Sequence, residues 1–130
     1  MKDDTQTLIE VAQKAQAFSY SPYSGFKVGS ALQADNNETY AGCNVENAAY
    51  PLGQCAEASA ISAMIVAGGK KISKIVIASP IDKFCPPCGG CRQKIKEFSD
   101  SDTQIIMSDK NGRTKTLSIA ELLPFAFELD

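Results

Sequence analysis

The 130-residue sequence contains no histidine. This absence excludes serine and cysteine nucleophiles that depend on an imidazole base, zinc sites built on imidazole, and the two-histidine metalloprotease helix. Acid–base chemistry in this chain must therefore come from Asp, Glu, Lys, Tyr or Cys side chains.

Excess positive charge and long apolar runs are also missing. The formal net charge is −2 and the sequence pI is about 5.1, so we expect neither nucleic acid nor an anionic membrane as a partner. The polar start, Met1 to Thr5, does not resemble a signal peptide, and no run reaches the length of a membrane span. We expect one domain, residues 1–130, in the cytoplasm, acting on a small uncharged substrate.

Five cysteines are present, an odd number that favours metal binding or catalysis over disulfides in a reducing compartment. Cys55-Ala56-Glu57 and Pro87-Cys88-Gly89-Gly90-Cys91 together supply three thiolates and one carboxylate. Three protein ligands and one open position are typical of catalytic zinc, whereas four ligands close a structural site. The sequence predicts one zinc ion, held by Cys55, Cys88 and Cys91, with Glu57 as the proton carrier.

A closed site remains an alternative. If Cys85 were a fourth ligand, the chain would be a non-catalytic, zinc-stabilised binding module. Cys43 falls in a predicted strand, where a small buried thiol is the usual role.

Hydrophobic periodicity and turn residues predict a helix–hairpin–helix–strand–helix–strand–strand–helix order. The predicted helices cover 5–19, 56–67, about 88–98 and a short turn after Ser118; the predicted strands cover 26–34, 38–43, 72–79, 104–108 and 113–117. This order predicts a three-layer α/β/α domain with a mixed sheet of about five strands.

Both cysteine clusters fall at predicted helix starts. Cys55 and Glu57 are two residues apart, so in the interior of a helix their side chains would point in nearly opposite directions. At the first turn of a helix both side chains can reach one metal ion. The positive ends of two helices would offset part of the thiolate charge, and Arg92 would add a cation beside the ligands.

Several segments together resemble the cytidine deaminases, in the three-cysteine form typical of the small homotetrameric enzymes. The similarity covers the two zinc motifs, through Arg92-Gln93, and three further segments. These are Tyr20-Ser21-Pro22-Tyr23-Ser24-Gly25-Phe26-Lys27-Val28-Gly29, Gly42-Cys43-Asn44-Val45-Glu46-Asn47-Ala48-Ala49-Tyr50 and Glu121-Leu122-Leu123-Pro124-Phe125-Ala126-Phe127.

The resemblance implies hydrolytic deamination of free cytidine and 2'-deoxycytidine, in which activated water attacks C4 of the ring and ammonia leaves. It implies that Asn44 and Glu46 bind the sugar, that Phe26 and Ala56 contact the ligand, and that Phe127 reaches a neighbouring subunit's site in a homotetramer. Residue patterns alone favour an Asx turn at Asn44 and a solvated charge at Glu46. Core packing is as good an explanation of Phe26 as a ligand contact, and packing on its own core is the alternative for Phe127.

One position departs from that pattern, because three-cysteine members usually carry Arg directly after the catalytic Glu and this chain has Ala58. Arg92 and the helix ends would then have to supply the missing positive charge. A deaminase of the same scaffold that acts on a cytosine-containing antibiotic such as blasticidin S is an alternative activity, although the sugar contacts favour ordinary nucleosides.

Overall fold

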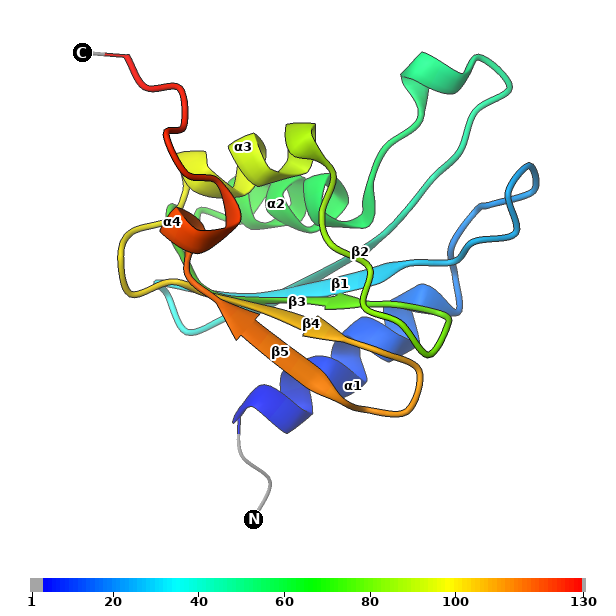
Figure 1. Cartoon of the computed structure of the whole chain (residues 1–130), viewed down its shortest axis with the longest axis horizontal. Helices are drawn as coiled ribbons and strands as arrows, with labels where there is room; N and C mark the ends of the chain where they lie inside the picture. The colour runs from blue at the N-terminus through cyan, green and yellow to red at the C-terminus, as the bar shows by residue number, and fades with distance from the viewer. Residues whose placement is uncertain (1–3, 130) are drawn as a thin grey trace.

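A computed structural model describes residues 4–129 of the chain, which form five strands and four α-helices (Figure 1). The helices are α1 (Asp4–Gln16), α2 (Ala56–Val66), α3 (Gly89–Glu97) and α4 (Ile119–Leu122), with one 3-10 turn, η1 (Tyr50–Leu52). The strands are β1 (Gly29–Ala34), β2 (Thr39–Cys43), β3 (Ile72–Ala78), β4 (Gln104–Ser108) and β5 (Thr114–Leu117).

The strands form one mixed sheet in the order β2-β1-β3-β4-β5. Only the β3–β4 pair is parallel, and the other three pairs are antiparallel. The last strand, β5, lies at the edge of the sheet with mostly exposed side chains, which suits a strand that pairs on one side only. The predicted five-stranded mixed sheet is therefore confirmed.

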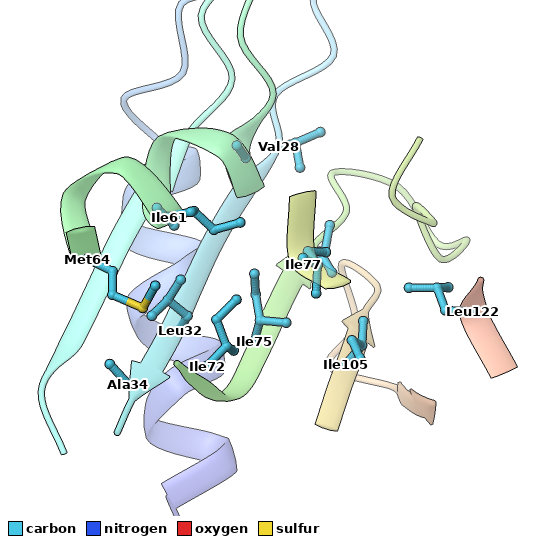
Figure 2. Close-up of a cluster of buried hydrophobic side chains, with 13 residues drawn as sticks. Val28, Leu32, Ala34, Ile61, Met64, Ile72, Ile75, Ile77, Ile105 and Leu122 are labelled. Atoms are coloured by element: carbon cyan, nitrogen blue, oxygen red, sulfur yellow. The ribbon is translucent and has the colours of Figure 1, made fainter. Parts of the chain in front are cut away.

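Helices cover both faces of the sheet (Figure 1). On one face α1 buries Leu8, Ile9 and Ala12 against alternate residues of the central strands. On the other face α2, α3 and α4 cover a larger apolar cluster, part of which Figure 2 labels. That cluster comprises Val28, Leu32, Ala34, Ala56, Ala60, Ile61, Met64, Ile72, Ile75, Ile77, Ile95, Ile105 and Leu122. The three-layer α/β/α prediction is confirmed, and β3 is buried on both faces as its apolar sequence indicated.

Strand direction brings two helix starts together. Because β2 and β3 are both antiparallel to β1, they run in the same direction and end at the same edge of the sheet. The chain leaves β2 toward α2 and leaves β3 toward α3, and the two helices lie next to each other over the same face (Figure 1). Their N-termini therefore meet near one edge of the sheet.

Two predicted boundaries were wrong by three residues, and the others agree to within one residue. The first helix ends at Gln16 rather than residue 19, which leaves Phe18 83% exposed. The first strand begins at Gly29 rather than residue 26, because the Asn44 side chain binds the preceding segment instead. Asn44 Nδ2 donates to the carbonyl of Phe26 at 2.8 Å, and the Val28 N–H donates to Asn44 Oδ1 at 3.0 Å.

We expect Gly42→Ala to destabilise the fold, since α2 packs directly on the backbone of β2 there. A Cβ at Gly42 would lie 2.5 Å from the Ala60 nitrogen and 2.6 Å from the Ala56 oxygen. Overpacking of this kind costs about 1–3 kcal/mol, measurable by urea unfolding. Gly53→Ala is the matched control, because its new Cβ would have only ordinary contacts from 3.4 Å outward. Equal stability of the two variants would contradict this account.

Candidate active site

The converging helix starts carry the predicted metal ligands. Cys55 is the N-cap residue of α2 and Cys88 is the N-cap residue of α3. The Cys91 N–H donates to Cys88 Sγ at 3.4 Å, so this sulfur also satisfies a free donor of the first turn. Cys91 lies in that turn and is buried. Each ligand position therefore follows from where a helix begins.

The three sulfur atoms of Cys55, Cys88 and Cys91 lie within 4.8 Å of one another. Cys55 Sγ and Cys88 Sγ are 3.9 Å apart. A tetrahedral zinc ion with Zn–S bonds of about 2.3 Å requires sulfur atoms separated by about 3.8 Å. The donor set and its spacing thus fit zinc.

Neither of the other cysteines joins this group. Within residues 4–129 the metal-competent cluster contains Cys55, Cys88 and Cys91 but not Cys85 or Cys43. Cys85 is half-buried and packs against the core cluster. A zinc ion held by these three sulfurs would keep one coordination position open, which disfavours the closed four-sulfur alternative.

The pKa values of the Cys55 and Cys91 thiols are shifted in opposite directions. A hydrogen bond from Cys91 lowers the pKa of Cys55 to about 6, against the opposing effect of burial. The same contact with Cys55, together with burial, raises the pKa of Cys91. A bound cation would replace these protons, because metal ligation requires thiolates.

Glu57 lies in the first turn of α2, two residues after Cys55, and is 4% exposed. Burial raises the pKa of its carboxyl group to about 7, and the nearby Cys55 adds to the rise. A carboxyl group that titrates near neutral pH can both accept and release a proton under physiological conditions. Ala56, between the two residues, is 1% exposed and forms part of the core.

A backbone bridge places the predicted sugar-binding residues next to the metal cluster. Val45 pairs with Gln54, with N–H to carbonyl distances of 2.9 and 2.8 Å in the two directions. Gln54 immediately precedes Cys55, and Val45 lies between Asn44 and Glu46. The two segments thus run side by side at the edge of the site.

Asn44 and Glu46 already have partners in their own chain. Asn44 binds the backbone of Phe26 and Val28, as described above, and also the Ser19 hydroxyl group. Glu46 accepts hydrogen bonds from the Tyr23 and Ser24 N–H groups at 3.0 and 3.1 Å and from the Ser24 hydroxyl group. The Ser24 hydroxyl bond is the leading cause that lowers the pKa of Glu46. Both side chains therefore shape the loop that carries Phe26, and their sugar contacts stay predictions.

Two other predicted residues lie outside the sulfur cluster. Phe127 is 70% exposed, and its carbonyl accepts a hydrogen bond from Gln93 Nε2 at 3.2 Å. It is thus not packed into its own core. Arg92 donates from Nε to the Pro87 carbonyl at 2.8 Å and from Nη1 to the Leu122 carbonyl at 2.9 Å. Its guanidinium group binds backbone oxygens, and its role as a cation beside the ligands stays a prediction.

Sequence reasoning missed Lys94. Its positive charge helps to lower the pKa of Cys55 and opposes part of the rise in the pKa of Glu57. Lys94 also borders a groove of about 500 Å³ between α2 and α3 that includes Ala58, the position without the expected Arg. The signal was its spacing, since Lys94 follows Cys91 by three residues and lies on the same side of α3.

Three sulfur ligands and a buried glutamate at the starts of two helices define a zinc-dependent hydrolase on an α/β/α scaffold. Residues 2–107 match the model of the cytidine and deoxycytidylate deaminase zinc-binding region. The chain is 38% identical to a cytidine deaminase from Mycoplasma genitalium, over 98% of each chain. It is 36% identical to one from Sporosarcina psychrophila, over 95% of this chain and 91% of the relative.

Solved structures give the same result. A cytidine deaminase from Burkholderia pseudomallei superposes with a TM-score of 0.90 at 36% identity, covering 98% of this chain and 100% of the other. The chain therefore belongs to the cytidine deaminases, a family of zinc-binding hydrolases, as its motifs indicated.

We expect Cys91→Ser to abolish zinc binding, whereas Cys85→Ser should retain one zinc ion per chain. Only the first substitution removes a member of the three-sulfur cluster. Metal content of the purified, dialysed proteins, measured by elemental analysis, tests this difference. Loss of zinc from Cys85→Ser would restore the four-sulfur interpretation.

Proposed function

We propose that this chain converts free cytidine and 2'-deoxycytidine to the corresponding uridines with release of ammonia. The observation that carries the proposal is the buried Glu57 beside three clustered cysteine sulfurs. Relatives named as cytidine deaminases, similar over nearly the full chain, support the same reaction. We take residues 1–130 as one catalytic domain.

Each residue has a distinct proposed task. Cys55, Cys88 and Cys91 would hold zinc, which acidifies water and makes it a nucleophile near neutral pH. Glu57 would accept the proton of that water, deliver it to N3 of the cytosine ring, and pass a second proton to the departing amine. Its burial keeps bulk water from competing for these protons.

A nucleoside fits better than a nucleic acid as the substrate. The acidic pI gives no electrostatic attraction to a phosphate backbone. The proposed sugar contacts, Asn44 and Glu46, hold the loop that carries Phe26, so sugar and ring would be recognised by one connected unit. Ala56 would contribute a contact to the ligand from the first turn of α2.

We also propose that the chain assembles as a homotetramer with sites shared between subunits. Apart from Glu57 and two serines, every residue of α2 is apolar, yet Ile65 is 46% and Val66 is 88% exposed. A helix that is apolar on all sides is normally buried on all sides. Aromatic side chains are also exposed in η1, between β2 and α2, and in the C-terminal tail, where Tyr50 is 75% and Phe127 is 70% exposed.

Among residues 4–129, no helix combines the length and apolar character required to cross a membrane. We propose a cytoplasmic location, because five free thiols suit a reducing compartment.

Glu57→Gln should retain zinc and lose about 10²–10⁴-fold in kcat, because the amide keeps the shape of the side chain but cannot carry the proton. The decrease in cytidine absorbance on deamination measures the rate, alongside a zinc count. Glu97→Gln, an exposed carboxylate on α3, is the matched control and should behave as the unmodified chain. A Glu57→Gln enzyme within tenfold of the control would refute the assigned role. Activity on deoxycytidylate or a cytosine-containing oligonucleotide in place of nucleosides would refute the substrate class.

Phe127→Ala should lose activity by itself but regain part of it when reassembled with inactive Glu57→Gln subunits. In the mixed oligomer, an intact Glu57 site would receive Phe127 from its neighbour. Phe18→Ala, which removes another exposed aromatic side chain, should retain activity without mixing. Light scattering gives the assembly state. A monomeric active enzyme, or verified hybrids without recovered activity, would contradict the shared site.

A further inference from the structure

Helix α3 contacts two other parts of the chain. One is the loop that ends in Pro87 and Cys88, which we call the metal-binding loop, and the other is residues 122–128, which we call the C-terminal segment. The helix holds Cys88 and Cys91 at its N-terminus. Three of its side chains contact the C-terminal segment: Arg92 at Leu122, Gln93 at Phe127 and Lys96 at Glu128. The helix is therefore a physical connection between the sulfur cluster and the end of the chain.

Arg92 differs from the other two because it binds both regions at once. One arm of its guanidinium group donates to the carbonyl of buried Pro87, the residue before Cys88, and the other donates to the carbonyl of Leu122. Leu122 is itself anchored in the core at 4% exposure. A planar guanidinium fork can hold two acceptors at fixed angles, whereas an ammonium group is a single point charge.

Gln93 and Lys96 hold only the far end of the segment. Gln93 Nε2 binds the Phe127 carbonyl at 3.2 Å, and Lys96 forms a 2.8 Å ion pair with Glu128, whose side chain is 69% exposed. Such an exposed pair contributes little to stability, and neither contact involves the metal loop. Lys96 therefore provides a control on the same helix and the same segment.

We propose that Arg92 is a positioning residue that couples zinc ligation to docking of the C-terminal segment on α3. It fixes the Pro87 carbonyl, and through it Cys88, relative to the end of α4. Zinc binding would order the loop and with it the segment that carries Phe127. By reciprocity, a docked segment would strengthen zinc binding.

This role is distinct from that of a simple cation near the thiolates. If only charge mattered, Lys at position 92 would preserve zinc affinity. If the two-carbonyl bridge matters, Arg92→Lys would lose it while keeping the charge. Partners that orient metal ligands typically change metal affinity by about 10–100-fold when they are removed.

The test uses the full chain with zinc as the probe. Competition with a chelator gives the zinc dissociation constant. Hydrogen exchange, measured with and without zinc, reports on the backbone amides of Leu122 and Leu123. These amides donate hydrogen bonds to the carbonyls of Ser118 and Ile119, respectively. We expect zinc to slow exchange at both amides in the unmodified chain. Arg92→Lys should weaken zinc binding by about tenfold or more and remove the zinc-dependent protection. Lys96→Gln should keep both.

The possible results separate this proposal from the proposed function, on whose zinc site it rests. Zinc affinity in Arg92→Lys equal to the unmodified chain would overturn the coupling while leaving the deaminase assignment intact. Zinc-independent exchange at Leu122 and Leu123 in the unmodified chain would do the same, and it needs no variant. A chain that binds no zinc would overturn both.

Discussion

The shared direction of β2 and β3 is the constraint on which the proposed site depends. Both strands pair antiparallel with β1, so both deliver the chain to the same edge of the sheet. The two helices that follow begin there with a cysteine as N-cap. Close packing of α2 on Gly42 fixes the height of one helix above the sheet. Reversal of either strand would separate the sulfurs by the length of a strand.

Local signals explain most of what the sequence predicted correctly. Hydrophobic periodicity placed the helix starts at Cys55 and Cys88, and the short turn expected after Ser118 is α4, which a Ser118–Glu121 capping box opens. The error at the start of β1 came from a contact distant in sequence. The residues around Phe26 give no sign that the Asn44 side chain, 18 positions later, donates a hydrogen bond to the Phe26 carbonyl. Because of this bond, β1 begins only at Gly29. Side-chain bonds of this kind compete with a strand ladder and leave no periodic trace.

The sequence predicted which cysteines lie together at the candidate site, but not which positively charged side chain lies near them. Cysteine spacing and helix starts were enough to group Cys55, Cys88 and Cys91. Which cation faces the sulfurs depends on helix rotation and on what else competes for it. Arg92 is next to a ligand in sequence, yet two carbonyl oxygens bind its guanidinium group. Lys94, two residues further along the same helix, is the cation whose charge acts on the pKa of Cys55 and Glu57.

The charge balance of a histidine-free zinc site connects the ligand chemistry to the fold. Three thiolates would leave zinc with a formal charge of −1, which makes bound water less acidic than neutral imidazoles would. Two helix N-termini contribute roughly half a positive charge each, about one unit in total. Lys94 adds positive charge at the side of the site where Ala58 carries none. The convergence of two helix starts thus offsets about one unit of the thiolate charge, which links the strand directions to the choice of ligands.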